Sequence, residues 1–131
     1  MTNENNSPQG NTGDIVNWPM LKVVYRTDPE GISSLFPPGI QPGADPHVNI
    51  TIYNFPVPDE PEYGIVTTIN ADYEGVAGEY TLGYGIDQES AIFISQETNG
   101  QPKYPCTTEY YRLGPMVSAR CIHQGYTFVE F

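Results

Sequence analysis

Side chains that could do covalent or metal chemistry are scarce in this chain. It has two lysines, Lys22 and Lys103, and two cysteines, Cys106 and Cys121. A lysine amine attacks a carbonyl only as the free base, and at the reference pKa near 10.4 only about one lysine in 2,500 is neutral at pH 7. A nucleophilic lysine therefore needs a site withdrawn from water, since desolvation favours the neutral amine. Without such a site, a loop lysine is an ordinary solvated side chain.

The cysteines and histidines do not form a metal-binding pattern. His123 follows Cys121 closely, but Cys106 and the distant His47 do not complete a spacing typical of zinc sites. Two cysteines are also too few for a disulfide framework, and they are typical of ordinary thiols in a reducing compartment. The sequence therefore predicts no metal site and no cofactor.

Composition and charge limit the class of protein. The 131 residues suit one domain, and the 13 Gly, 13 Pro and 10 Tyr favour short strands over long helices. The net charge of -11 argues against a nucleic-acid surface and against binding to an anionic membrane. No signal peptide and no apolar run of bilayer length is visible. We expect a cytoplasmic protein with a disordered polar leader over residues 1–16 and one domain over residues 17–131.

Periodicity predicts a mainly β (α+β) fold that is mostly antiparallel, with two short helices. The predicted strands cover residues 20–26, 48–55, 63–73, 79–86, 116–123 and 126–131. A helix is expected from a capping box at Thr27 and Glu30 to residue 35, and a second over residues 88–98, with Asp87 as N-cap and Gly100 as its stop. Residues 40–47 and 101–105 are expected to be loops.

The chain ends in a run typical of a strand, residues 126–131. An apolar strand there needs a pairing partner. Another subunit could supply it, or the chain could be part of a longer one.

Four segments carry a resemblance to a known family. They are VYRTDPE at 24–30, LFPPGI at 35–40, GEY at 78–80 leading to Ile86 and Asp87, and residues 91–103 ending in GQPK. In order and spacing, they resemble the acetoacetate decarboxylase family over nearly the whole chain after the leader. The resemblance implies an antiparallel β-barrel, or part of one, with short flanking helices in a homo-oligomer.

The resemblance also implies a chemistry and a catalytic residue. Members of the family decarboxylate a small 3-oxo acid through a lysine imine (Schiff base), and related members catalyse other imine reactions, including aldol-type ones. Lys103 after Pro102 occupies the place of the family's active lysine. Glu97 matches a glutamate of the family's helix, where it could shuttle protons or orient Lys103, although a solvated Glu97 is as good an interpretation.

Several positions depart from the family pattern. Tyr104 stands where decarboxylases carry a second lysine, and Trp18 stands where an arginine is expected. Ile65 stands where a glutamate is expected, although Glu62 could serve in its place. The family also continues well beyond residue 131.

An oxo-acid substrate needs a cation for its carboxylate. The guanidinium groups of Arg26, Arg112 and Arg120 are the candidates, and for Arg26 pairing with a surface acid is the favoured alternative. The predicted substrate-binding set consists of Arg26, Arg120, Glu62, Tyr104 and Trp18. Two alternatives to an imine-forming lyase stay open: a non-catalytic barrel that binds a small apolar or keto ligand, and an inactive partial chain.

Overall fold

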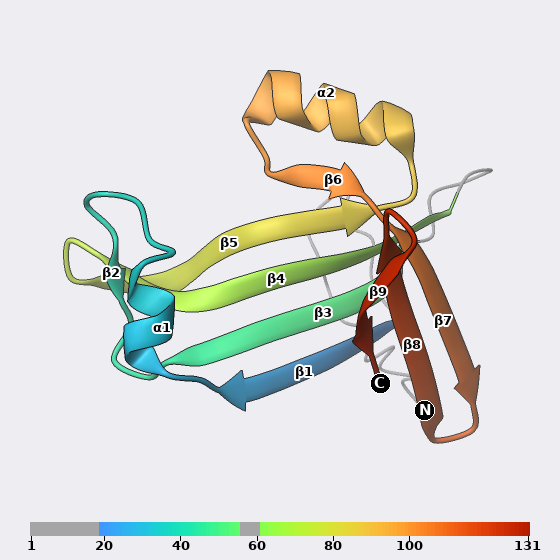
Figure 1. Ribbon diagram of the computed structural model, residues 1–131, viewed down its shortest axis with the longest axis horizontal. Coiled ribbons are helices and arrows are strands. Elements are labelled where there is room, and N and C mark those ends of the chain that lie inside the picture. Colours follow the sequence, from blue (N-terminus) through green and yellow to red (C-terminus); the bar gives the residue numbers. More distant parts are fainter. Residues whose placement is uncertain (1–18, 56–60) are drawn as a thin grey trace, which may run out of the picture.

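The computed structural model describes residues 19–55 and 61–131, which form two β-sheets and two short helices (Figure 1). The expected mainly β fold with two short helices is confirmed. The strands of the larger sheet are β1 (Met20–Arg26), β2 (Gln41–Pro42), β3 (His47–Phe55), β4 (Glu62–Tyr73), β5 (Val76–Ile86) and β6 (Lys103–Pro105). Those of the smaller sheet are β7 (Thr107–Leu113), β8 (Met116–His123) and β9 (Tyr126–Glu130), and the helices are α1 (Pro29–Ser33) and α2 (Glu89–Asn99).

The larger sheet has the order β1-β3-β4-β5-β6, with β2 beside β4. Its neighbours are antiparallel except β5 and β6, which are parallel because α2 returns the chain to the same end of the sheet. In Figure 1, α2 lies beyond the β6 edge of this sheet. The edge strand β6 therefore has a helix beside it.

The smaller sheet, in the order β7-β8-β9, runs across one end of the larger one (Figure 1). Only Cys106 separates β6 from β7, so the chain passes directly from one sheet to the other. Within residues 19–55 and 61–131 the two sheets stay open, and they do not close into the barrel that the resemblance implies. In this part of the chain β1 and β6 each pair on one side only.

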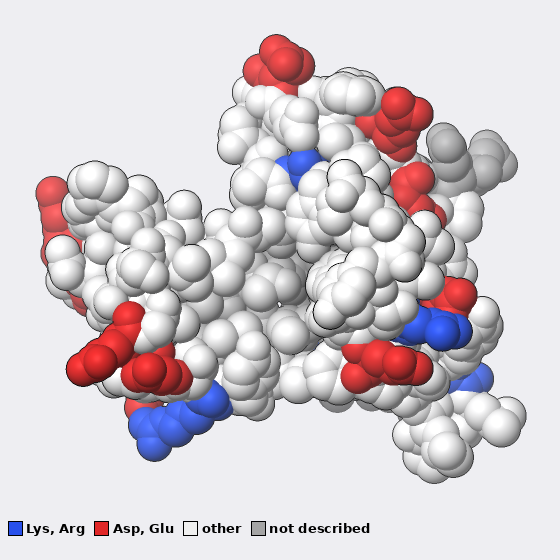
Figure 2. Space-filling model, in the orientation of Figure 1, with Lys and Arg blue, Asp and Glu red and all other residues white. Residues whose placement is uncertain are grey.

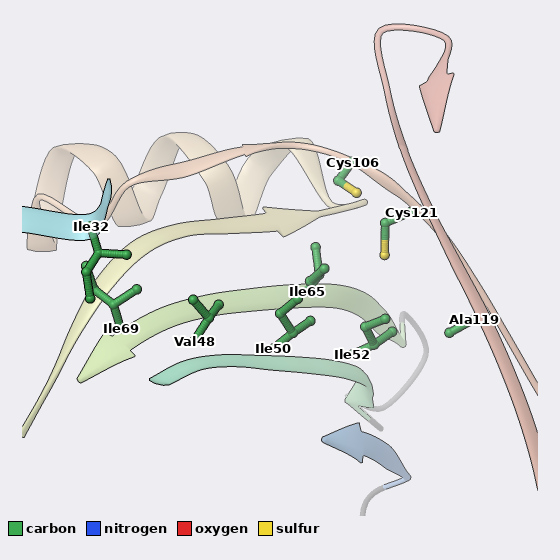
Figure 3. Close-up of a cluster of buried hydrophobic side chains, with 9 residues drawn as sticks. All are labelled: Ile32, Val48, Ile50, Ile52, Ile65, Ile69, Cys106, Ala119 and Cys121. Carbon is green, nitrogen blue, oxygen red and sulfur yellow. The ribbon is translucent and has the colours of Figure 1, made fainter. Parts of the chain in front are cut away.

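The core lies between the sheets, on one face of the larger sheet. Alternation along β3 and β4 places their isoleucines on this face, where they pack against β8 and, at the other end, against α1 (Figure 3). Burial of each such side chain contributes about 1.5–3 kcal/mol. The buried cluster consists of Ile32, Val48, Ile50, Ile52, Ile65, Ile69, Cys106, Ala119 and Cys121.

The helices form where expected, but both N-caps differ from the prediction. At α1 the Asp28 carboxylate, not the Thr27 hydroxyl, accepts the Glu30 amide at 3.0 Å. At α2 the N-cap is Gln88, and the carboxylate of Asp87 accepts the backbone amide of Tyr63 at 3.0 Å instead of capping the helix. The predicted helix stop is correct, since Gly100 adopts a left-handed conformation with φ of 62°.

Two segments expected to be loops contain strands, and one strand had no prediction. Within residues 101–105, β6 pairs with β5, and within residues 40–47 the short β2 pairs with β4. The unpredicted strand is β7. None of the helices in the described ranges is long and apolar enough to span a membrane. The expected boundary between leader and domain, at residues 16 and 17, lies outside the described residues.

Candidate functional site

Lys103 projects from the edge strand β6 on the face of the larger sheet opposite the core. Its register partner on β5 is Tyr84, and paired residues of neighbouring strands point to the same face. The Lys103 amine (Nζ) lies 6.0 Å from the centroid of the Tyr84 ring, within the range of a cation–π contact. Lys103 is half-buried as a residue.

A pocket of about 460 Å³ lies on this face, across β3, β4 and β5. We call it the β3–β5 pocket. Tyr84 forms part of its wall, and Lys103 contacts the Tyr84 ring without being one of the lining residues. Its lining mixes phenols, hydroxyls and carboxylates with apolar groups, and consists of Thr51, Tyr53, Phe55, Glu62, Val66, Thr68, Glu79, Thr81 and Tyr84.

A buried phenol holds one carboxylate of the pocket in place. The Tyr53 hydroxyl donates to Glu62 Oε1 at 2.9 Å. Burial, and next the charge of Glu62, raise the pKa of Tyr53 far above its ordinary value. Tyr53 therefore stays protonated and acts as a fixed donor, and the Glu62 carboxylate is oriented at one end of the pocket.

Helix α2 supports the lysine through Gln96 instead of Glu97. Ile92 of α2 packs with Tyr53 and Ile86, which fixes the helix against this face. The Gln96 side-chain amide donates to the Lys103 carbonyl at 2.6 Å, so a backbone carbonyl at the unpaired edge of β6 has a hydrogen-bond partner. Glu97 is exposed, and within the described part of the chain no hydrogen bond or ion pair joins it to Lys103. Sequence reasoning missed Gln96, because only the strand pairing of β6 leaves that carbonyl in need of a donor.

Tyr104 points to the opposite face from Lys103, as successive residues of a strand must. Its ring lies against Gly83 and Gly85, where a Cβ would come within 3.0 Å of ring carbons. The ring also meets His123 edge-on, with centroids 5.2 Å apart. Burial, with smaller contributions from Cys106 and Cys121, raises the pKa of Tyr104 to about 12. The structure thus does not bring Tyr104 and Lys103 together in one site.

The two predicted carboxylate-binding arginines lie elsewhere, each in an ion pair. Arg26 ends β1, and its guanidinium Nη2 lies 2.8 Å from Asp45 Oδ1, both side chains being largely exposed. The alternative interpretation of Arg26, pairing with a surface acid, is the one observed. Trp18, the remaining predicted contact, lies outside the described residues.

Arg120 forms its ion pair on the smaller sheet, on the face of β8 opposite the buried Ala119 and Cys121. Its Nε and Nη2 donate to Glu109 Oε2 at 2.9 and 2.7 Å, and this hydrogen bond raises the pKa of the guanidinium. Figure 2 shows that basic side chains are few and scattered on the visible surface, whereas acidic ones recur along its rim.

The two cysteines lie close together at the junction of the sheets (Figure 3). The Thr108 hydroxyl is 3.8 Å from both sulfurs. A hydrogen bond from Cys121 lowers the pKa of Cys106, although burial opposes this effect. Among the described residues, no three His, Cys, Asp or Glu side chains are grouped so that they could hold a metal ion.

Comparison with known proteins identifies the family. The family model described as acetoacetate decarboxylase (ADC) matches residues 2–131. The chain belongs to the acetoacetate decarboxylase family. It is 34% identical over 92 residues to an acetoacetate decarboxylase of Paraburkholderia phytofirmans, a match that covers 67% of this chain and 35% of the relative. Over 87 residues it is 28% identical to an acetoacetate decarboxylase of Clostridium botulinum, covering 63% of this chain and 35% of the relative.

Solved structures share the fold at low sequence identity. Acetoacetate decarboxylase from Legionella pneumophila has a TM-score of 0.73 at 16% identity, over 85% of this chain and 45% of that one. The enduracididine biosynthesis enzyme MppR, solved with pyruvate, has a TM-score of 0.69 at 17% identity, over 85% of this chain and 52% of that one. The chain therefore spans about a third of the length of the curated relatives it matches, and about half of the solved ones.

Proposed function

We propose that this chain acts as an acetoacetate decarboxylase-type lyase, in which Lys103 forms an imine with a small oxo acid. The observation that carries the proposal is that Lys103 is half-buried and that its amine lies 6.0 Å from the ring centroid of Tyr84, a residue of the wall of the β3–β5 pocket. A pocket of about 460 Å³ has room for a molecule of this class. The pyruvate complex of MppR supports an oxo acid as the ligand class.

The proposed reaction begins with attack of the neutral amine on the ketone and loss of water. For a 3-oxo acid, the protonated imine then draws electrons from the bond between Cα and the carboxylate, so that CO2 leaves and an enamine remains. Protonation of the enamine and hydrolysis release the product and the free amine. Glu62 is a pocket carboxylate with a fixed orientation, since Tyr53 donates to it, and we assign it proton transfer to and from the pocket.

Borohydride reduction tests this proposal, because it converts an imine into a stable secondary amine. The folded chain is incubated with acetoacetate, pyruvate and longer 2- and 3-oxo acids, reduced, digested and analysed by mass spectrometry. We expect an adduct on Lys103, and none in Lys103→Arg, which keeps the charge but offers no comparable nucleophile. The two lysines fall in different peptides, so the site is unambiguous. No adduct with any acid, on protein shown to be folded, removes the imine chemistry.

A second candidate function, non-catalytic binding of a small apolar ligand, is favoured by another pocket. About 450 Å³ lies among three aromatic rings at the β8–β9 turn, those of Tyr104, Tyr126 and Phe128, together with His123. The Pro105 carbonyl can only accept, so His123 donates to it through Nδ1 at 2.6 Å. This function predicts that apolar ligands raise the melting temperature without any borohydride adduct, and that Phe128→Ala removes the effect.

The family resemblance also implies a homo-oligomer, and we keep it as part of the proposal. The tip of the β7–β8 hairpin exposes Tyr111, Leu113 and Met116. Apolar groups gathered in this way favour association. Sedimentation velocity of the wild type and of Leu113→Ser checks the oligomer, which should dissociate more readily in the variant.

A further inference from the structure

The strand registers place the chain's other lysine in line with Lys103. Lys22 on β1 pairs with Thr51 on β3, and Thr51 pairs with Val66 on β4. Val66 then pairs with Tyr84, and Tyr84 with Lys103. Residues paired across neighbouring strands share a face. Lys22 and Lys103 therefore stand at opposite ends of one row, on the face that carries the β3–β5 pocket.

The three residues between the lysines all line that pocket, so the pocket lies between the two lysine positions of the row, although neither lysine is one of its lining residues. With strands about 4.8 Å apart, the two lysine Cα atoms are roughly 19 Å apart. An extended lysine reaches roughly 6 Å from Cα to Nζ. The gap between the two amines is therefore roughly 7 Å at its smallest, when both side chains extend along the row toward each other, and in that arrangement a small oxo acid can join one amine covalently and reach the other with its carboxylate.

The other basic groups of the chain are engaged or distant. The five Lys and Arg residues all fall in the described ranges. Arg26 pairs with Asp45 and Arg120 with Glu109. Arg112 lies at the end of β7, where its Nε donates to a carbonyl of the hairpin turn at 3.2 Å. Lys22 is therefore the one cation, apart from Lys103, on the pocket's face that forms no ion pair within the described part of the chain.

The acidic groups of the pocket define where a carboxylate cannot lie. Glu62 lines the pocket at the start of β4, and Glu79 lines it on β5, on the other side of the row that contains Val66 and Tyr84. A substrate carboxylate directed along the strands would approach one of these anions. One directed across the strands, along the row, approaches Lys22. Attraction to Lys22 and repulsion from Glu62 and Glu79 therefore favour the same orientation of the substrate carboxylate.

We propose that Lys22 binds the carboxylate of the oxo acid whose carbonyl reacts at Lys103. This inference rests on the proposed function of Lys103. It assigns to Lys22 the role for which the sequence suggested Arg26 and Arg120. The role is specificity: Lys22 favours oxo acids over uncharged ketones, and it contributes nothing to imine formation with a ketone that lacks a carboxylate.

Rates of borohydride trapping with charged and uncharged partners test the assignment. Pyruvate and acetone are compared at low ionic strength in the wild type, Lys22→Gln, Lys22→Arg and Arg112→Gln. We expect Lys22→Gln to slow trapping of pyruvate about threefold to fivefold, the range of a partly exposed ion pair, and to leave acetone unchanged. Lys22→Arg should retain most of the pyruvate rate, and 0.5 M salt should remove the difference. Arg112→Gln makes the same change in net charge away from the pocket, and it should behave like the wild type.

A second measurement does not depend on imine chemistry. Lysine labelled with 13C at Cε gives two signals, which the variants assign, because the chain has only two lysines. Titration with butyrate, an acid without a ketone, should shift the Lys22 signal to saturation, whereas the neutral butyramide should not shift it. The shift should be absent for an equal concentration of chloride.

The outcomes separate the two proposals. A loss confined to pyruvate in Lys22→Gln, with a saturable butyrate shift, supports both. Equal rates for pyruvate in the wild type and Lys22→Gln, or an equal loss for acetone, overturns the role of Lys22 and leaves Lys103 in place. If no partner is trapped, the proposed function fails. The butyrate titration then decides alone, and an unmoved Lys22 signal overturns the carboxylate site.

Discussion

Replacing Gly64 by alanine should destabilise the protein and disturb the candidate site together. Gly64 lies on β4 opposite Tyr53, and a Cβ added there would lie 2.6 Å from both Cζ and Oη of that ring. It would also lie 2.9 Å from the Gly85 carbonyl oxygen, which belongs to the neighbouring strand. Neither neighbour can move freely, since Tyr53 is only 6% exposed and the carbonyl is part of the sheet. The added methyl group therefore has no space.

The expected cost is either strain or the loss of one hydrogen bond. Overpacking a close-packed site costs about 1–3 kcal/mol. If Tyr53 swings away, its hydrogen bond to the Glu62 carboxylate is lost, at about 1.5–3 kcal/mol for a bond to a charged group. These are alternative ways to relieve one clash and do not add, so the expected cost is about 1–3 kcal/mol. For a domain of this size, the upper end of that range lowers the melting temperature by roughly 10 °C.

Urea unfolding followed by far-ultraviolet circular dichroism measures the change in free energy of unfolding. Gly78→Ala is the matched control, because nothing lies within 4 Å of the added Cβ and Gly78 is also in a strand. It should change stability by no more than about 1 kcal/mol. In a Tyr53→Leu background, which makes room, Gly64→Ala should cost clearly less. If Gly64→Ala matches Gly78→Ala, or if its cost is the same in the Tyr53→Leu background as in the wild type, the clash is not the cause.

Two further predictions concern a titration and a helix cap. Burial raises the pKa of Tyr104 to about 12 in the folded state, against an unfolded value near 10. Between those values the folded state holds more protons than the unfolded state, so the contribution of Tyr104 to stability is complete below pH 10 and falls as the pH rises toward 12. Tyr104→Phe should flatten this decline in a series of urea unfolding measurements at pH 9.5–11.5. An unchanged slope would contradict the burial of the phenol. Asp28→Ala should lower the stability by about 1 kcal/mol, because the carboxylate caps α1, whereas Thr27→Ala should lower it clearly less. Thermal unfolding of both variants checks this order. A larger loss for Thr27→Ala would restore the predicted capping box.

The sequence was most informative where one face of a strand is buried. Strands β3 and β4 carry isoleucines at alternate positions, so the core face could be predicted from the sequence. Strand β7 escaped prediction because its inward residues are Thr108 and Tyr110, and its outward Tyr111 and Leu113 are exposed and apolar. Its alternation therefore runs against the usual pattern.

The candidate site could be predicted only in part, because ion pairs and strand registers are properties of the folded chain. The family resemblance selects Lys103, but no local pattern shows that Asp45 forms an ion pair with Arg26 or that Glu109 forms one with Arg120. Lys22 had no signal of its own in the sequence. Its relation to Lys103 exists only through four successive pairings across the sheet.

The direction of Lys103 depends on the register of a three-residue strand, and Tyr104 fixes that register. A slip of one residue in β6 would exchange the faces of Lys103 and Tyr104. The bulky Tyr104 ring fits where Gly83 and Gly85 leave the β5 surface without side chains. On the opposite face of β5, the Tyr84 side chain fills the space between the positions of the two glycines. Slippage would therefore drive the Tyr104 ring into Tyr84 and leave the space above the glycines empty.

Two backbone hydrogen bonds support the same register at the two ends of β6. The Tyr84 amide donates to the Pro102 carbonyl, and the Cys106 amide donates to the Ile86 carbonyl. In this chain the residue that replaces the family's second lysine lies on the core face, yet it determines that the first lysine points to the face that carries the β3–β5 pocket.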